Sequence, residues 1–507
     1  MRTVMAFLLV AVTLSACGSG EGGASANGIL KYGYLMSVQG INLDPAKANG
    51  FHEMVYYKLI QGSLLRYNQD GSVTPWMAKS VEIVDPTRVK ISLREGVTFS
   101  DGTPFDAEAI RINLLRLREP LTPQAKGGQG AGIKVLDNVE VVDPLTAVAT
   151  LSKPLAGLLY SDLTSVAGVM VSPKQIAEDP DGINTNPIGA GPFTVHSHAV
   201  GQRLSVRKNE KYWDAENIKL AGVDLINAPI GPQQANGLLS GQLDFASFIS
   251  PNSAAAVDAD KKYSSKVLNS TNIFLNMCTA KAPFDNADFR QAVQLGIDRE
   301  RFSELAYGGL AEPAYGMIPE GTALFDPELK NIVKYDADAA KKLVADSGVS
   351  DPSFPLVYPA TINLAVESET LQRQLEEVGI SSTISAERDV YSGFMVPQKP
   401  GAMLVFTVGT APNYQLFSQY FNGLQALCGV KRDDVMEALA PSASLALDDP
   451  AAKAAYDEAG RLIAENADII PVVTYPNVQA WNKNRVTNEP TFDAQGFANL
   501  DQMMVSN

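Results

Sequence analysis

Apolar and polar positions along the chain follow two periods, which predicts a mixture of strands and amphipathic helices. Short runs rich in β-branched residues are typical of strands: RVKISL (88–93), NVEVVD (138–143) and IIPVVTY (469–475). Ile110, Leu114 and Leu117 instead recur at helical spacing, after an Asp106 that can cap the first turn. A second such helix is expected to open at Asp449-Pro450. The predicted fold class is therefore α/β.

The stretch FDNADFRQAVQLGIDRERF (284–302) crowds acidic and basic side chains together, so it has to be considered as a catalytic site. An apolar stripe at helical spacing runs through it, made of Phe289, Ala292, Val293, Gly296 and Ile297. Asp288 lies in the first turn, where negative charge favours the helix dipole. Asp298 is expected to cap a second helix that ends near Gly308. We interpret these charges as part of helix construction, with the acids on the solvent side.

The N-terminus carries the strongest local signal. MRTVMAFLLVAVTLSAC has one basic residue and then an apolar run, too short to span a bilayer comfortably and typical of a signal peptide. The small residues before Cys17 resemble a bacterial lipobox, in which the cysteine is lipidated. We predict a signal peptide over 1–16, lipidation at Cys17 and a flexible tether over 17–27, because GSGEGGASANG cannot build a core. A plain secretory signal with an incidental cysteine is the alternative.

The two remaining cysteines are Cys278 and Cys428. In an exported protein an even number of remaining cysteines predicts a disulfide. This bridge would close a long loop in the C-terminal half. The alternative is two buried free thiols.

Composition narrows the classes of partner. The 507 residues are enough for two or three domains, and 45% hydrophobic with 19% charged residues is ordinary for a globular protein. A net charge of −15 argues against nucleic acid and against anionic membrane surfaces, both of which favour basic patches.

No catalytic motif is found in the sequence. The chain has three histidines, and HEMVY (52–56) has Tyr56 where a zinc-protease helix needs its second histidine. His196 and His198 would share a face of a strand, but two ligands do not make a metal site. No G-x-S-x-G nucleophile elbow occurs. A secreted hydrolase with scattered catalytic residues stays open, because triad members need not be neighbours in sequence.

Seven motifs in order carry a resemblance to a known family. They are INLDPAKA (41–48), LLRYNQDGSVTPWMAKS (64–80), LREGVTFSDGTPFDAEAI (93–110), PIGAGPF (187–193), KNEKYWD (208–214), LLSGQLDFA (238–246) and FLNMCTAKAPFDNADFRQAVQLGIDRERF (274–302). From about residue 30 to its C-terminus the chain resembles the extracellular solute-binding proteins of family 5, the oligopeptide, dipeptide and nickel binders of ABC importers.

The resemblance implies a periplasmic-binding-protein-like type II clamp of two lobes with an additional inserted domain. Lobe I would combine 28–60, 187–276 and 472–507. The inserted domain would occupy 61–186, and lobe II 277–471. Ligand would bind between the lobes, and closure about the hinge would bury it.

The resemblance also implies where ligand contacts lie. The end of the first strand falls on Met36, Ser37, Val38 and Gln39. The lobe II segment that usually carries a tryptophan and an aspartate reads LVFTVGTAPNYQLF (404–417) here, with neither. The polar candidates in this segment are Thr410, Asn413 and Tyr414. Tyr391, before the segment, and Tyr475, in the returning strand, are further candidates, with ordinary packing at a hinge strand as the alternative for Tyr475. Because a buried ammonium without a carboxylate is costly, the usual capture of a free peptide N-terminus is in doubt.

The implied function is that of a substrate-binding lipoprotein that delivers a peptide or peptide-like solute to an ABC permease. A non-peptide solute, either an oligosaccharide or a metal chelate, is the alternative within the same clamp. We expect no enzymatic activity, no cofactor, no resident metal and no nucleic acid. We also expect a monomer that is held outside the cytoplasm by its lipid anchor.

Overall fold

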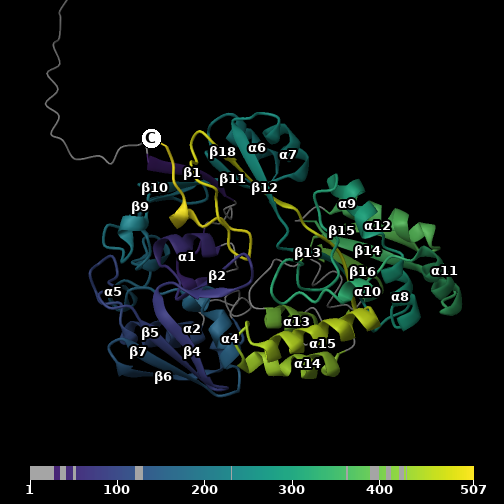
Figure 1. The fold of residues 1–507 in the computed structure, drawn as a ribbon, viewed down its shortest axis with the longest axis horizontal. Coiled ribbons are helices and arrows are strands. Elements are labelled where there is room, and N and C mark those ends of the chain that lie inside the picture. Colours follow the sequence, from purple (N-terminus) through teal and green to yellow (C-terminus); the bar gives the residue numbers. More distant parts are fainter. Residues whose placement is uncertain are drawn as a thin grey trace, which may run out of the picture.

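Three sheets of four or more strands organise the part of the chain that the structure describes (Figure 1). The computed structural model describes residues 28–34, 41–48, 53–119, 121, 130–229, 231–360, 364–388, 399–406, 413–421, 428–429 and 431–506. The predicted signal peptide, tether and Cys17 lie outside these residues. Within them, no helix is long and apolar enough to cross a membrane.

A seven-stranded sheet lies at the top left of Figure 1. In spatial order its strands are β12 (Tyr263–Leu268), β18 (Asn477–Asn482), β11 (Phe245–Ile249), β1 (Ile29–Tyr34), β10 (Gly222–Asn227), β9 (Arg203–Lys208) and β8 (Phe193–Ala199). β1 is parallel to both of its neighbours. Tyr32 in its middle pairs with Leu225 of β10 on one side and with Phe245 of β11 on the other. Helices α6 (Pro232–Leu239) and α7 (Pro251–Asp258) pack on its β11–β18–β12 half.

A four-stranded antiparallel sheet lies below it, in the order β4 (Ala78–Asp85), β5 (Arg88–Leu93), β7 (Thr146–Leu151) and β6 (Leu136–Asp143). Helix α2 (Ala107–Arg118) packs on β6 and β7, and Asp106 caps it by accepting from the Ala109 N–H at 2.9 Å. One continuous core joins the buried residues of this sheet to many of those of the seven-stranded sheet. The seven-stranded sheet forms a second, smaller cluster with α6 and α7. The shorter elements nearby are α1 (Met54–Ile60), β2 (Leu65–Tyr67), β3 (Val73–Pro75), α4 (Ala156–Asp162) and α5 (Pro173–Glu178).

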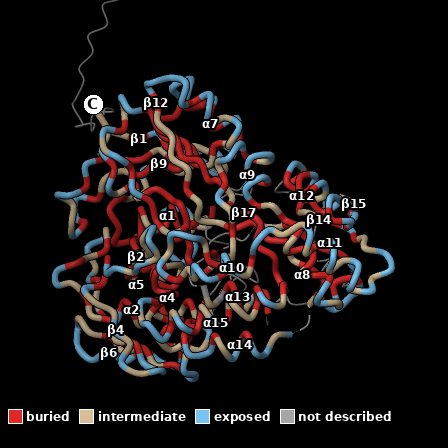
Figure 2. The backbone as a smooth tube through the Cα atoms, turned by 45° about the vertical axis from the view of Figure 1, so that its right-hand side comes forward, coloured by how far each residue is buried: buried red, intermediate tan, exposed pale blue. Residues whose placement is uncertain are grey.

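A five-stranded sheet on the right of Figure 1 has a core of its own (Figure 2). Its order is β15 (Ser381–Glu387), β14 (Ser353–Pro359), β16 (Ala402–Phe406), β13 (Asn272–Met277) and β17 (Ile469–Thr474). The helices around it are α8 (Ala287–Leu295), α9 (Arg299–Tyr307), α11 (Ala337–Asp346) and α12 (Ala365–Glu377). The strand predicted at 469–475 is thus the edge strand β17.

The charged stretch 284–302 folds as the two expected helices, α8 and α9. Asp298 caps α9 by accepting from the Arg301 N–H at 3.0 Å, and Gly308 ends it with φ +60°. The sequence did not indicate that Arg290 and Arg299 are buried. Arg290 donates to the Phe284 carbonyl, and Arg299 donates to the Ala314 and Pro471 carbonyls. The arginines tie the two helices to neighbouring segments, which supports a structural role for these charges.

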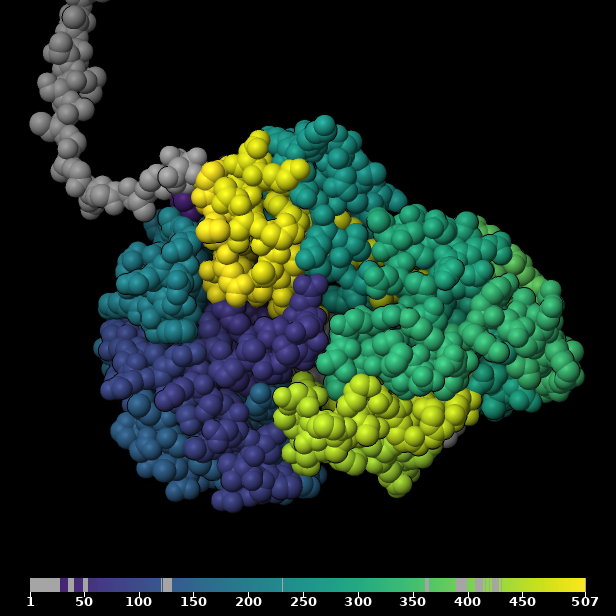
Figure 3. Space-filling view, viewed as in Figure 1, coloured from purple at the N-terminus to yellow at the C-terminus, as the bar shows by residue number. Residues whose placement is uncertain are grey.

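A helical layer lies below the five-stranded sheet. It contacts the part of the molecule that contains the four-stranded sheet and α4 (Figure 3). It contains α10 (Leu329–Ile332), α13 (Asn413–Phe421), α14 (Asp433–Leu439) and α15 (Pro450–Asn466), with Asp449 as the expected cap of α15. The 3₁₀ turn Ala440–Ser444 packs against α4. A disulfide joins Cys278 to Cys428, with their Cα atoms 4.6 Å apart.

Candidate functional site

A cavity of about 840 Å³ lies between the seven-stranded and five-stranded sheets. Five stretches of the chain contribute its described walls. The lining residues are Tyr67, Gln69 and Asp70 from the β2–β3 turn; Val267–Ser270 and Asn272; Glu300, Glu312, Pro313, Tyr315, Met317–Thr322 and Lys330; Leu416 of α13; and Asp493, Ala494 and Gly496. The volume is in the range of small-molecule and cofactor sites.

The chain passes between the two sheets twice in the described residues, and the first crossing lines the cavity. The first runs from β12 to β13 and the second from β17 to β18. They are hydrogen-bonded to each other, because the Tyr475 N–H donates to the Thr271 carbonyl at 2.6 Å. The Thr474 hydroxyl donates to Asn269 Oδ1 and accepts from the Glu312 N–H, both at 2.9 Å. Two segments that are hydrogen-bonded to each other form the connection between the halves in the described part of the chain.

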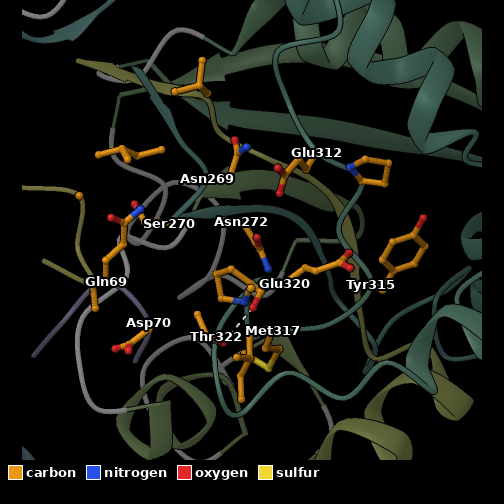
Figure 4. Close-up of a pocket in the computed structure, with 18 of the residues that line it drawn as sticks. Gln69, Asp70, Asn269, Ser270, Asn272, Glu312, Tyr315, Met317, Glu320 and Thr322 are labelled. Carbon is orange, nitrogen blue, oxygen red and sulfur yellow. Dashed lines mark hydrogen bonds between the residues drawn. The ribbon is translucent and has the colours of Figure 1, made fainter. Parts of the chain in front are cut away.

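Asn272 is buried at this connection, yet one of its polar atoms has no partner among the described residues. It lies opposite Thr474 in the β13–β17 pairing and is 2% exposed. Its Nδ2 donates to the Gly316 carbonyl at 2.9 Å, whereas Oδ1 accepts no hydrogen bond. An unpaired buried amide oxygen is costly, so a ligand N–H donor at this wall would be stabilising. Figure 4 shows Asn272 between Glu312 and Thr322.

The described lining is strongly acidic. It contains five carboxylates and one cation, Lys330. The carboxylates belong to Asp70, Glu300, Glu312, Glu320 and Asp493. Lys330 is paired with Glu320 at 2.5 Å, and Asp493 is paired with Lys58 at 2.6 Å. No ion pair or side-chain hydrogen bond to Glu312 is found among the described residues. The cavity is therefore matched in charge to a cationic group.

Asp70 is held in its ionised form. The Ser72 hydroxyl and N–H donate to Asp70 Oδ1 at 2.7 and 2.9 Å, and these hydrogen bonds lower the pKa of the carboxyl. The turn itself touches the opposite half of the molecule, because the Ala323 N–H donates to the Asp70 carbonyl at 3.4 Å. Asp70 thus contributes a stable negative charge where the two halves meet.

Several residues predicted from the resemblance lie outside the described part of the chain. They are Met36, Ser37, Val38, Gln39, Tyr391 and Thr410, together with the side chain of Asn413. Tyr414 is half-buried on α13, and burial raises the pKa of its hydroxyl. Leu416, in the same predicted segment, lines the cavity. The ligand-binding role of these residues stays a prediction.

Tyr475 lies on the second crossing but is not among the described lining residues. Its ring packs edge-on against Tyr307, with centroids 6.1 Å apart. Burial, together with the nearby Glu367 carboxylate, raises the pKa of the Tyr475 hydroxyl. Burial likewise raises the pKa of Glu367. In this structure Tyr475 packs against Tyr307 of α9.

The histidines do not form a metal site with other described residues. His196 and His198 lie on β8, an edge strand of the seven-stranded sheet, and neither lines the cavity. Burial lowers the pKa of His198. No group of three or more His, Cys, Asp or Glu residues with suitable geometry occurs in the described residues.

Sequence reasoning missed the residues at the connection. The run Asn269-Ser270-Thr271-Asn272 interrupts two strand-like segments with four small polar residues, which is the signal that could have marked the crossing. Glu312 and the 493–496 segment gave no local signal, because only the tertiary fold brings them to the cavity.

Comparison with known proteins identifies the family. The sequence profile described as "Bacterial extracellular solute-binding proteins, family 5 Middle" matches residues 72–425. The chain belongs to this family. The glutathione-binding protein GsiB of Salmonella paratyphi A is 28% identical over 350 residues, covering 68% of this chain and 67% of GsiB.

Solved structures of similar proteins share the fold over nearly the whole chain. The ABC transporter substrate-binding protein CtaP of Listeria monocytogenes has a TM-score of 0.80 at 21% identity, covering 95% of this chain and all of that one. NikA of Brucella suis, solved with Fe(III)-EDTA, has a TM-score of 0.80 at 20% identity, covering 94% and 100%. The chain is an α/β protein of the type II periplasmic-binding-protein-like fold, as predicted, and its homologues are solute-binding proteins.

Proposed function

We propose that this solute-binding protein captures a peptide or peptide-like solute in the cavity between its two sheets and delivers it to an ABC permease. The observation that carries the proposal is the cavity at a two-strand connection between separate cores. The glutathione-binding relative supports a peptide-like ligand. The amide and carboxylate lining can pair with peptide N–H groups.

The packing supports a division into moving parts. The resemblance implies lobe I over 28–60, 187–276 and 472–507, the inserted domain over 61–186 and lobe II over 277–471. Because β13 and β17 belong to the five-stranded sheet, we place the boundaries between the lobes at the crossings, 268–272 and 474–477. Lobe I and the inserted domain share one continuous core, so they are expected to move as a single body. Lobe II has cores of its own, so closure is a rotation about the two crossings.

Closure stabilises the complex because it removes the ligand from water. Polar groups such as Asn272 Oδ1 must then be matched by the ligand, and a solute that leaves them unpaired binds more weakly. The closed form is the one that a permease can distinguish from the empty protein. In this scheme no bond is made or broken.

The ligand class is tested by recovering what the protein binds. Native mass spectrometry of protein purified without denaturation is expected to show an intact co-purified solute, and a thermal-shift screen is expected to give its largest shifts with peptides. Larger shifts with oligosaccharides or metal chelates would replace the peptide assignment. Turnover of added peptides would overturn the binding function in favour of a hydrolase.

Lipid anchoring through Cys17 is part of the proposal. A signal peptide over 1–16 and a tether over 17–27 would keep the monomeric clamp near its permease. Cys17→Ser is expected to move the protein from the membrane fraction to the soluble extracytoplasmic fraction without changing ligand binding. Retention of the variant on the membrane would contradict the lipoprotein assignment.

A further inference from the structure

We propose that Glu312 and Asn272 form a subsite for a cationic nitrogen group of the ligand, so that the protein selects positively charged peptides. The inference rests on the proposed peptide-binding function and specifies its substrate class. The ligand group is an ammonium or guanidinium, supplied either by the peptide's α-amino terminus or by a lysine or arginine side chain.

The first argument is the position of the two residues. The Glu312 N–H is bound to the Thr474 hydroxyl at 2.9 Å, and Asn272 lies opposite Thr474 in the strand pairing. Both residues therefore adjoin Thr474 at the connection between the lobes, and both line the cavity. Figure 4 shows Glu312 and Asn269 at the same wall as Asn272. The backbone of Glu312 is fixed, while its carboxylate projects into the cavity.

The second argument is what these side chains lack. Asn272 is 2% exposed, and its Oδ1 has no hydrogen-bond donor among the described residues. The one cation of the described lining, Lys330, is committed to Glu320 at 2.5 Å. An N–H group of a ligand cation would satisfy Asn272 Oδ1 and neutralise Glu312 together. A neutral or anionic solute would do neither.

The third argument is the field of the whole cavity. The other carboxylates of the described lining, among them Asp70 and Glu300, have the same sign as Glu312. A cleft lined by one sign of charge concentrates ligands of the opposite sign. The subsite replaces the missing aspartate of the 404–417 segment with a carboxylate from a different part of lobe II. Recognition of a ligand cation is therefore retained at a different position in the fold.

The test measures capture from a defined mixture. Purified protein is incubated with a pepsin digest of casein, and bound peptides are identified by mass spectrometry. The wild-type protein is expected to enrich peptides of positive net charge. The most enriched peptide is then synthesised unmodified, with an acetylated α-amino group, and with its lysine or arginine replaced by norleucine. The modified form that loses affinity identifies which nitrogen occupies the subsite.

Glu312→Gln is the decisive variant. Glu312 is exposed, and its side chain makes no ion pair or hydrogen bond with the other described residues, so the variant should fold as the wild type does. It is expected to weaken binding of the enriched peptide about tenfold, and to leave binding of the form without the cation unchanged. Glu376→Gln removes the same charge from an exposed position on α12 that does not line the cavity, and is expected to bind as the wild type does.

The outcomes separate the two proposals. Capture of peptides without charge preference, or equal affinity of Glu312→Gln and wild type for the enriched peptide, would overturn this inference and leave peptide binding standing. Capture of no peptide at all would overturn the proposed function, and the inference with it.

Discussion

Asp162 is a buried carboxyl group at the end of α4. It is 1% exposed, its Oδ2 accepts from the Ile133 N–H at 3.0 Å, and its Oδ1 has no partner among the described residues. Loss of solvation raises the pKa of Asp162 to about 7, and the hydrogen bonds from Ile133 and Gly132 only partly offset this. Its charge state therefore changes within the physiological range of pH.

This residue predicts a pH dependence of stability. The unfolded carboxyl titrates near pH 4, so between about pH 4 and 7 the folded state binds more protons than the unfolded state. The free energy of unfolding should therefore fall as pH rises through this range and level off above it. Asp162→Asn should remove this contribution, so that its stability relative to wild type increases between pH 5 and pH 8.

Urea unfolding at several pH values measures the effect. Asp351→Asn is the matched control, because Asp351 is exposed and its substitution should leave the pH profile of the wild type intact. Parallel profiles for wild type and Asp162→Asn would show that Asp162 is ionised normally in the folded protein.

At the scale of elements, one buried hydroxyl group contributes two hydrogen bonds at the paired crossings. Thr474 is 1% exposed and connects Asn269 to Glu312. Thr474→Val keeps the shape but leaves both partners unsatisfied, and should lower the free energy of unfolding by about 1–3 kcal/mol. Chemical denaturation measures this. Thr474→Ser should restore most of the stability, and a valine variant as stable as wild type would exclude the hydroxyl as a determinant of the hinge.

The contact between α4 and the segment after the 3₁₀ turn 440–444 requires a glycine. A Cβ at Gly157 would lie 2.1 Å from the Leu445 carbonyl oxygen, which is a backbone atom that cannot move aside easily. Gly157→Ala should therefore separate the inserted domain from lobe II and weaken ligand binding. Small-angle scattering should show a larger radius of gyration for this variant than for wild type.

Gly460 offers a matched control within α15. A Cβ there would meet only Leu329 side-chain atoms, at 3.5 and 3.9 Å, which is ordinary contact. Gly460→Ala should leave the scattering profile unchanged and stabilise the helix by up to about 1 kcal/mol. Unchanged scattering for Gly157→Ala as well would mean that the contact does not control the separation of the parts.

At the scale of the whole molecule, the Cys278–Cys428 disulfide closes a loop of 150 residues within the half that contains the five-stranded sheet. Cross-linking so long a loop restricts the unfolded chain, so replacing both cysteines with serine should lower the free energy of unfolding by about 4 kcal/mol. Denaturation of wild type with and without reductant should reproduce the same difference. Two reactive thiols in the unreduced, unfolded protein would contradict the bridge.

The separation into cores determines how the molecule can move. Buried residues of the seven-stranded and four-stranded sheets pack together in one core, whereas the five-stranded sheet has a separate core. Because closely packed interiors resist deformation, motion is confined to the two crossings and to the surface contacts between the parts. The cavity lies at that boundary, which is where a change in separation alters its shape most.

Local sequence determined the features that depend on neighbours along the chain. The caps at Asp106, Asp298 and Asp449 and the apolar stripe of α8 were predicted because capping and helical periodicity are short-range effects. The order of motifs identified the family and its clamp, since each motif belongs to one element of a shared fold. The missing aspartate of 404–417 could also be read directly from the sequence.

Only the tertiary structure decided the cavity. Asp70, Asn272, Glu312 and Asp493 are far apart along the chain and meet because the crossings bring two sheets together. Arg290 and Arg299 are buried because they donate hydrogen bonds to carbonyl groups of other segments, those of Asn466 and Ala314. The spacing of apolar residues in the sequence cannot predict such contacts. Charge patterns describe single elements, whereas a binding site depends on which elements pack against each other. For this reason the carboxylate that we propose for ligand recognition lies outside the segment in which the sequence directed us to look.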